Sequence, residues 1–400
     1  MVDLNMDNER DEVELNFYFP EETKESELQE LKRKRNEILM SLGYIFDEEG
    51  NLVSENTQMF DGILGFTVAD ALGVPAEASS REALEINPVT EMMGFGRYDV
   101  PAGTWSDDTS MMLATMDSLV ECDGINFKDM MKRFVEWADF GKYSVDNNTF
   151  DVGVRTRNAL RRFKRHVKPL LCGGFEEKDN GNGSLMRMLP VAYYLSKNDF
   201  PEEREIYIVN DISSLTHAHH ISCLGCVIYC DYVKQLLNGK DKYDSLEYVM
   251  NKDYKKYYDD SVVDAYSRIL NGDIVSLDKD SISSSGYVVD TLEACLWSTL
   301  TSESYEEAVT KAVNLGRDTD TIGALTGGLN GIIYGKEKIP NRWLNGIRNR
   351  EYLESMGEKF TNYLYGMRKQ EQIESDSIDL AAMLDNSATN SIEFNKNSSK

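Results

Sequence analysis

Two short acidic clusters, more than two hundred residues apart, constrain this chain more than any other feature. Residues 105–109 read Trp-Ser-Asp-Asp-Thr, and residues 318–321 read Asp-Thr-Asp-Thr. Ionised carboxylates this close together repel one another unless water or a cation neutralises them. A fold that brings the two clusters face to face would therefore create a cage of hard oxygen ligands.

The donor types in these clusters indicate which metal the cage would hold. Neither cluster contains His or Cys, so oxygen ligands favour magnesium or manganese over zinc or copper. The alternative is that each cluster simply caps a helix, because apolar residues at helical spacing follow both. Asp318 and Asp320 are two residues apart and do not share a helix face, so they must converge from a loop or a helix start. We favour the paired-metal interpretation.

The hydrophobic pattern predicts an all-α fold. Residues 61–73 are rich in Gly, Ala and Leu at helical spacing, which lets a helix approach its neighbours closely in a core. Alternating strand patterns are scarce, so we expect a compact orthogonal bundle of many helices. Further helical patterns cover residues 109–121, 127–139, 153–166, 184–196, 203–213, 219–237, 261–270, 288–300, 305–314, 321–334 and 351–368.

A metal site shared by the two acidic clusters requires one fold to join them, which favours one large domain over residues 56–368. Residues 1–55 read as a charged N-terminal appendage with a helical section at 27–42. Residues 369–400 are too poor in apolar side chains to fold, so we predict a disordered polar tail. The polar stretch 238–285 is expected to form two short helices and loops on the surface.

Charge and cysteine content limit the function classes. The formal net charge of −26 argues against binding to nucleic acid or anionic membranes, which need basic patches. No segment reads as a membrane-spanning helix, and residues 1–14 lack the order of a secretion signal. The six cysteines show no short disulfide-framework spacing. We therefore expect a cytoplasmic protein without a membrane partner.

Two further elements carry candidate chemistry. Pro75 lies at the exit of the Gly-rich helix and fixes the chain direction, which makes Glu77 a candidate base or water-positioning carboxylate. Residues 181–184, Gly-Asn-Gly-Ser, precede a helical run, so their backbone N–H groups could approach a phosphate closely. In so acidic a chain, the backbone and a few cations such as Arg187 would have to hold that phosphate.

A rival metal site lies in residues 216–230. Three of the four histidines of the chain and a Cys-x-x-Cys pair could together bind zinc. Apolar residues surround the cysteines, which recur at three- and four-residue steps, so buried free cysteines on a helix are the favoured interpretation. His217 remains a plausible ligand contact. The residues concerned are His217, His219, His220, Cys223, Cys226 and Cys230.

Taken together, these motifs resemble the ADP-ribosylglycohydrolase family, which includes the dinitrogenase-reductase-activating glycohydrolases. The resemblance runs from about Asp61 to Trp343 and covers most of the chain. The tryptophan-led double aspartate and the later Asp-x-Asp-Thr are its most specific motifs. The matching segments are 65–77, 103–111, 181–190, 214–217, 285–294, 316–328 and 339–343.

The resemblance implies a central cleft that holds two Mg²⁺ or Mn²⁺ ions and ADP-ribose. The positions matching the family's metal ligands are Ser106, Asp107, Asp108, Asp318, Asp320 and Thr321. Those in its substrate-binding segments are Asn180, Gly181, Asn182, Gly183, His217, Gly286 and Tyr287. The catalytic candidates are Glu77, Asp107 and Asp151, the last within a Phe-Asp-Val-Gly element at 150–153 that lies near the distal ribose in the arginine-directed branch.

Two positions depart from the family pattern. Ser106 stands where Thr is frequent, which retains a hydroxyl oxygen. Ala69 replaces a glycine before Asp70, which is expected to tighten packing in the first helix. Neither change removes an oxygen donor, so neither predicts an inactive protein.

The expected function is metal-dependent removal of ADP-ribose from a modified protein side chain, with arginine as the first choice. The expected partner is an ADP-ribosylated protein or a small ADP-ribose conjugate. One alternative is a non-catalytic ADP-ribose-binding or structural protein on the same scaffold, which would be expected to lose metal ligands. Another is a hydrolase of ADP-ribosyl-serine or of a small ADP-ribose derivative. ADP-ribosylated nucleic acid is the least favoured substrate because of the acidic charge.

Overall fold

The computed structural model describes residues 44–46 and 52–365 of the chain, and the predicted helix at 27–42 and tail at 369–400 lie outside them. Strand β1 (Tyr44–Phe46) pairs antiparallel with β2 (Leu52–Ser54) in a small hairpin. The helices are α2 (Glu55–Gly73), α3 (Arg81–Ile86), α4 (Asp107–Glu121), α5 (Phe127–Phe140), α6 (Val154–Lys164), α7 (Leu189–Ser196), α8 (Glu202–Ser214), α9 (His220–Leu237), α10 (Lys242–Asn251), α11 (Asp260–Asp264), α12 (Ser267–Leu270), α13 (Val288–Leu300), α14 (Tyr305–Val313), α15 (Thr319–Tyr334) and α16 (Asn341–Leu344), followed by a helix over 350–365.

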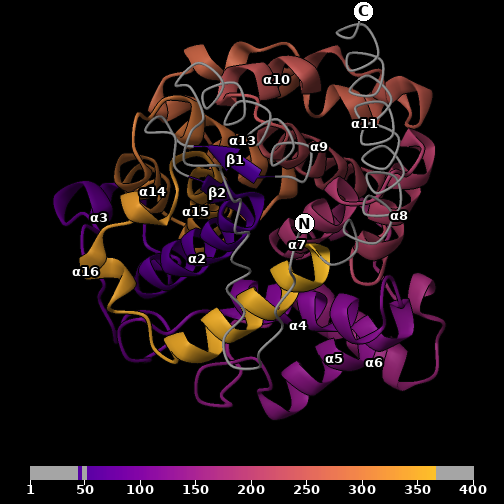
Figure 1. Cartoon of the computed structure of the whole chain (residues 1–400), viewed down its shortest axis with the longest axis horizontal. Helices are drawn as coiled ribbons and strands as arrows, with labels where there is room; N and C mark the ends of the chain where they lie inside the picture. Colours follow the sequence, from indigo (N-terminus) through magenta and orange to yellow (C-terminus); the bar gives the residue numbers. More distant parts are fainter. Residues whose placement is uncertain (1–43, 47–51, 366–400) are drawn as a thin grey trace, which may run out of the picture. The chain divides into compact units, whose positions relative to one another are not determined.

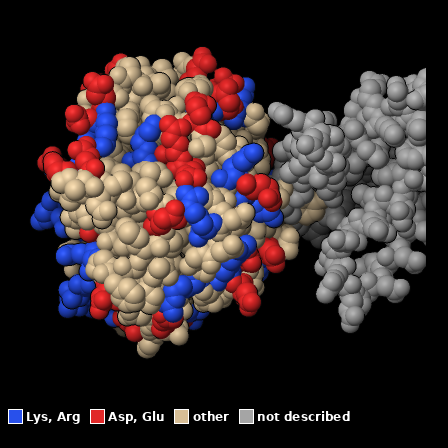
Figure 2. Space-filling model, turned by 90° about the vertical axis from the view of Figure 1, so that its left-hand side faces the viewer, with Lys and Arg blue, Asp and Glu red and all other residues tan. Residues whose placement is uncertain are grey.

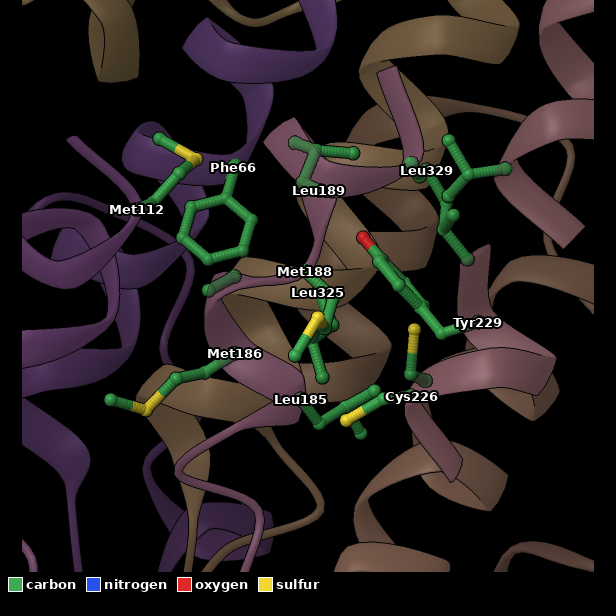
Figure 3. Packing of buried hydrophobic residues seen from close by; sticks show 14 of the residues in the cluster. Phe66, Met112, Leu185, Met186, Met188, Leu189, Cys226, Tyr229, Leu325 and Leu329 are labelled. Atoms are coloured by element: carbon green, nitrogen blue, oxygen red, sulfur yellow. The ribbon is translucent and has the colours of Figure 1, made fainter. Parts of the chain in front are cut away.

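The unit from residue 56 onward is a bundle of packed helices, so the predicted all-α fold is confirmed (Figure 1). Helix α9 packs against α7, α8, α10 and α13, while α5 and α6 lie together at one edge. The core joins side chains from distant parts of the sequence (Figure 3). Fully buried examples are Phe66 of α2, Met112 of α4, Leu189 of α7, Tyr229 of α9 and Leu325 of α15.

Surface charges are mixed on the face shown in Figure 2, toward α3 and α14, where acidic and basic side chains alternate. Exposed ion pairs join distant segments, such as Arg342 with Glu91 at 2.8 Å and Lys279 with Glu85 at 3.0 Å. Exposed pairs contribute about 0–1 kcal/mol each. The buried core therefore supplies most of the stability.

The backbones of helices α2 and α15 approach each other closely at glycines. A Cβ on Gly331 would lie 2.4 Å from the Asp61 carbonyl oxygen, and one on Gly327 would lie 2.3 Å from that of Gly65. Each four-residue step along α2 is matched by a four-residue step back along α15, so the helices run antiparallel. The C-terminus of α2 therefore lies beside the N-terminus of α15. Ala69 fits because it faces glycines of α15.

The polar stretch 238–285 differs from the sequence-based prediction. It holds three helices, α10 to α12, and it is not confined to the surface, because Val249, Tyr254, Tyr266 and Ile274 are buried. Tyrosines bury their rings while their hydroxyls find partners, as Tyr266 does by donating to the Ile221 carbonyl at 2.7 Å. The polar composition of this stretch therefore led to too small a predicted contribution to the hydrophobic core.

Two predicted helices are divided in the structure. The predicted helix 184–196 is a 3-10 turn, Leu185–Arg187, followed by α7, which has a proline in its first turn. Proline is favoured at that position because its missing N–H has no partner in a first turn. The predicted helix 261–270 is likewise two short helices, α11 and α12.

One segment meets the length and composition of a membrane span, contrary to the sequence-based expectation. Thr57–Ala76 has a mean hydropathy of 1.3, but 89% of this window is buried inside the protein. Its apolar character is explained by its central place in the core, where neighbouring helices cover it on all sides. Among the described residues it is the one such segment.

The contact between α2 and α15 generates a stability prediction. Gly327→Ala places a methyl group against a backbone oxygen that cannot move aside, so we expect unfolding free energy to fall by about 1–3 kcal/mol. Gly328→Ala is the matched control, because it gives α15 the same gain in helix propensity but meets movable side-chain atoms of Phe66 and Leu189 at 3.2 and 3.3 Å. Urea denaturation measures both variants. Equal stability of the two would contradict this packing.

Candidate metal centre and cleft

Three segments bring acidic side chains to one place. Helix α2 ends at Gly73, and a short 3-10 turn containing Pro75 leads to Glu77. Asp107 and Asp108 occupy the first turn of α4. The antiparallel packing of α2 and α15 brings the start of α15 to the same point, where the Thr319 N–H donates to the Glu77 carboxylate at 2.9 Å across 242 residues of sequence.

Asp70 fixes the start of α4. This buried carboxylate accepts hydrogen bonds from the Ser106 N–H at 3.0 Å, the Thr109 N–H at 3.1 Å and the Thr109 hydroxyl at 2.6 Å. The first N–H groups of a helix have no partner within it, so a carboxylate from another helix can satisfy them. Burial raises the pKa of Asp70 to about 6, although these bonds favour its ionised form. The sequence signal was an acid near the end of an apolar helix.

The acids form two groups that share one residue. Oxygen atoms of Asp70, Asp108 and Asp320 lie within 4.8 Å of one another, as do those of Glu77, Asp318 and Asp320. Asp108 Oδ1 and Asp320 Oδ2 are buried and have no hydrogen-bond partner among the described residues. Buried polar atoms are rarely left unpaired. An oxygen-only donor set with unpaired carboxylate atoms fits a hard divalent cation.

The electrostatics of the group point the same way. Burial, reinforced by the neighbouring carboxylates, raises the pKa values of Asp107, Asp108 and Asp320 well above the ordinary range. Burial raises the pKa of Asp318 to about 6, and burial together with Asp318 raises that of Glu77 to about 8. Mutual repulsion of this kind is relieved by protons or by cations. Binding of a proton or a cation at this site is therefore electrostatically favourable.

Hydroxyl groups connect the two clusters. Ser106 caps α4, since its Oγ accepts from the Asp108 N–H at 3.2 Å and also donates to Asp108 Oδ2 at 2.8 Å. The Thr321 hydroxyl donates to the same Asp108 oxygen at 3.4 Å and links α15 to α4. The capping interpretation thus holds for Ser106, whereas Asp318 makes no side-chain cap bond on α15. Capping and metal binding are compatible at the first cluster.

A cleft of about 470 Å³ opens above these acids. Most of the predicted site residues line it, whereas Ser106, Asp108 and Asp320 are buried and lie outside its wall. The roles of all the predicted site residues remain predictions. The predicted residues in the wall are Glu77, Asp107, Asp151, Asn180, Gly181, Asn182, Gly183, His217, Gly286, Tyr287, Asp318 and Thr321; the wall residues that sequence reasoning missed are Gly153, Val154, Arg155, Thr156, Glu177, Lys178 and Met186.

The Gly-Asn-Gly loop is tied to the acids by Asn182. Its side-chain amide donates to Asp318 at 2.7 Å and to Thr291 at 3.0 Å, and its N–H donates to the Gly286 carbonyl at 3.1 Å. A Cβ on Gly183 would lie 2.8 Å from the His217 ring, so glycine is required there. The loop is therefore held at a fixed distance from the acidic group.

Asn180 and His217 support the loop from below. Asn180 is buried and accepts from the Ser222 N–H at 3.2 Å, which attaches the loop to the start of α9. His217 is buried beside the Thr216 hydroxyl at 2.9 Å. Burial, with a contribution from Arg187, lowers the pKa of His217 to about 3. The imidazole of His217 is therefore neutral, and it contributes a polar but uncharged surface to the cleft wall.

The expectation that Arg187 meets a phosphate is wrong. Arg187 is fully buried behind the loop, where it donates to the carbonyls of Gly183 and, at 3.0 Å, Ile212. Burial lowers its pKa to about 10. The cations that line the cleft are Arg155 and Lys178. A short loop before a turn did not reveal which side of it each side chain would take.

Asp151 lies in the cleft wall with strained backbone. Its φ of 54° is in the left-handed region, which non-glycine residues adopt mainly where surrounding structure imposes it. Burial and then a hydrogen bond to Asp151 raise the pKa of Tyr98, whose ring lies 5.0 Å from that of Phe150. The segment 150–153 is thus held in one conformation at the cleft.

The rival zinc interpretation gains no support. Cys223, Cys226 and Cys230 are buried on α9, and Cys226 Sγ lies 3.4 Å from the Ser184 hydroxyl. In the part of the chain that the structure describes, each group of potential metal ligands consists of carboxylates alone. The cysteines are free, and they behave as small apolar core residues.

Comparison with known proteins agrees with this site. Residues 56–372 match the family described as ADP-ribosylglycohydrolase. An ADP-ribosylarginine hydrolase of Serratia proteamaculans is 29% identical over 300 residues, which are 74% of this chain and 77% of that protein. One of Pseudomonas putida is 30% identical over 302 residues, 74% and 76% of the two chains.

Two further matches extend over nearly the whole of the related protein. An ADP-ribosyl-dinitrogen reductase glycohydrolase of Rhodospirillum rubrum is 27% identical over 296 residues, 74% of this chain and 91% of that protein. A solved chain of an ADP-ribosylglycohydrolase-related protein complex has 29% identity and a TM-score of 0.64, covering 78% of this chain and 99% of its own. The family match over residues 56–372 spans the segments that build the cleft.

The raised pKa values predict an unusual dependence of stability on pH. Without divalent cations, Asp318 and Glu77 favour the folded state when protonated, so their contribution is present below about pH 4 and lost as pH rises through about 6 and about 8. Cations bind the ionised carboxylates, so magnesium or manganese should raise the melting temperature more at pH 8 than at pH 5. Thermal unfolding with chelator and with metal measures this difference. A shift that is equal at both pH values, or that persists in Asp320→Asn, would contradict it.

Proposed function

The chain belongs to the ADP-ribosylglycohydrolase family, and we propose that it hydrolyses the bond between the distal ribose of ADP-ribose and a modified arginine side chain. The observation that carries the proposal is the pair of carboxylate groups that share Asp320, of which Glu77 and Asp318 line the cleft. The arginine linkage is supported by the two ADP-ribosylarginine hydrolases at 29% and 30% identity. The substrate would then be an ADP-ribosylated protein or a small conjugate.

We assign two divalent cations, Mg²⁺ or Mn²⁺, to the acidic group. Asp108 and Asp320 offer the unpaired buried oxygens, and Asp318, Ser106 and Thr321 add further oxygen donors nearby. When bound, such cations would orient the ribose hydroxyls and lower the pKa of a water molecule. A set of carboxylates and hydroxyls without nitrogen or sulfur suits both metals.

The cleft supports recognition of the diphosphate by the backbone. Gly181 and Gly183 lie in its wall, and among the described residues their N–H groups donate to no protein acceptor. Such free N–H groups suit a phosphate in a protein of this negative charge. Arg155 and Lys178 add cations at the same wall. Asn182 fixes the loop against Asp318, which would place a bound ribose against the acids.

Glu77 suits the role of proton acceptor. Its pKa, raised to about 8, lies close to neutral pH, where a group that must both accept and release a proton is most effective. The Thr319 N–H holds its carboxylate at 2.9 Å, so its position is fixed relative to Asp318 and Asp320. Asp107 and Asp151, also in the wall, could stabilise the positive charge that develops on the ribose.

Two other readings lead to different experiments. A non-catalytic ADP-ribose-binding protein would be expected to lose metal ligands, yet all six candidate positions carry oxygen donors. A hydrolase of ADP-ribosyl-serine or a small derivative would use the same cleft. We further propose a cytoplasmic location, which the six free cysteines support.

Turnover assays test the proposal directly. We expect metal-dependent release of ADP-ribose from ADP-ribosyl-arginine, with Asp320→Asn lowering kcat/KM by ~10³-fold because it removes the carboxylate shared by both groups. Asp211→Asn, on α8 and outside the cleft wall, is the control and should retain activity. ADP-ribosyl-serine and O-acetyl-ADP-ribose are tested in parallel. Tight ADP-ribose binding without turnover of any substrate would refute a hydrolase and favour the binding protein.

A further inference from the structure

Helix α6 and the turn after it carry a concentration of positive charge in an otherwise acidic protein. The chain has a net charge of −26, yet residues 152–175 contain no Asp or Glu. The same segment contains seven basic residues. They are Arg155, Arg157, Arg161, Arg162, Lys164, Arg165 and Lys168.

The basic residues of α6 and its C-cap differ in their partners, and Arg162 donates to the Cys172 carbonyl at 2.7 Å. Arg155 pairs with Asp179 at 3.2 Å, and Lys164 pairs with Asp139 at 2.9 Å. Arg157, Arg161 and Arg165 are exposed and have no carboxylate partner among the described residues. We call these three the arginine stripe.

The geometry of α6 places the arginine stripe on one side of the helix. Its three members are four residues apart, which is close to one helical turn. The opposite side packs into the domain through Thr156 and Ala159, which are buried. The stripe is therefore directed to solvent along its whole length.

Helix stability does not account for the arginine stripe. Basic residues in the last turn of a helix interact favourably with its dipole, which explains Arg161 and its neighbours. The first turn is different, because Arg157 lies near the positive end, with no acidic residue beside it and no side-chain cap. Like charges four residues apart also repel. The charge of Arg157 therefore acts against the helix that carries it, and the dipole accounts for only part of the stripe.

The arginine stripe begins at the cleft. Val154, Arg155 and Thr156 belong to the cleft wall, and the stripe leads away from them along α6 for about 15 Å. Figure 1 shows α6 beside α5 at an edge of the bundle. Val154 and Leu171, at the two ends of this helix and its following turn, are 59% and 68% exposed. Exposed apolar groups beside arginines are typical of protein interfaces.

We propose that the arginine stripe docks an acidic segment of the protein whose modified side chain enters the cleft. This inference rests on the proposed hydrolase function. Complementary charge would steer such a segment to the one basic helix at the cleft and orient it there. A long nucleic acid would instead meet the acidic charge of the remaining surface, so a short acidic stretch of protein fits better.

The test compares substrates that differ only in their flanking charge. The full-length wild type and Arg157→Gln/Arg161→Gln/Arg165→Gln are assayed on free ADP-ribosyl-arginine and on one ADP-ribosyl-arginine peptide with Asp/Glu or Asn/Gln flanks. We expect the variant to lose about tenfold in kcat/KM on the acidic peptide, mainly through KM, and to match wild type on the other two. The loss should shrink as salt is added.

The control variant is Lys240→Gln/Lys256→Gln/Lys338→Gln. It removes the same charge from three exposed lysines away from α6 that have no ion-pair partner among the described residues. It should retain wild-type activity on the acidic peptide. Equal losses in the two variants would show a general charge effect and overturn the docking surface, as would an unchanged arginine-stripe variant.

A binding measurement separates this proposal from the proposed function. Fluorescence anisotropy of the labelled, unmodified acidic peptide should show weaker binding to the arginine-stripe variant than to wild type, whether or not any substrate is hydrolysed. Absence of turnover on all substrates would sink the hydrolase alone. Peptide binding that is the same in both proteins would sink the docking surface. Tighter wild-type binding to a single-stranded oligonucleotide of equal charge would replace the acidic protein with a nucleic acid.

Discussion

The close backbone contact between α2 and α15 is the constraint on which the site depends. Glycines at four-residue intervals let carbonyl oxygens of one helix occupy the space where the other would carry side chains. The two helices therefore have one antiparallel register, and that register decides that Glu77 and Asp320 meet. An acidic cluster without this contact would be two separate helix caps. The chemistry is a consequence of helix packing.

The energetic cost of the site is concentrated in its buried carboxylates. Both carboxylate oxygens of Asp70 accept hydrogen bonds from the start of α4, whereas Asp108 and Asp320 each retain one oxygen without a partner among the described residues. Asp70 therefore positions the first turn of α4 beside the carboxylates with which it shares a group of potential metal ligands. Hydroxyls from Ser106 and Thr321 complete the connection between helices without adding charge. Repulsion between the buried carboxylates of this arrangement is relieved when a proton or a cation binds.

Much of this was predictable from the sequence, for identifiable reasons. Strong apolar periodicity gave helices such as α9 and α15 nearly to the residue, and two unusual acidic motifs indicated a shared site. Side-chain direction was not predictable from short motifs, so Arg187 was assigned to a phosphate although it lies behind the loop. Polarity misled in the tyrosine-rich stretch 238–285. The two cations of the cleft wall, Arg155 and Lys178, were not predicted because the negative net charge of the whole chain conceals the local excess of basic residues in 152–175.

The glycine contacts between the two ends of the domain also bear on how the protein is made. Helix α2 is synthesised before α15, and some 240 residues of chain separate the two segments. During that interval a strongly apolar helix lacks its main neighbour, and such exposed surface invites aggregation. The apolar surface of α2 is therefore covered by α15 only after that helix has been made. Packing of α15 against α2 then completes the central helix contact of the domain.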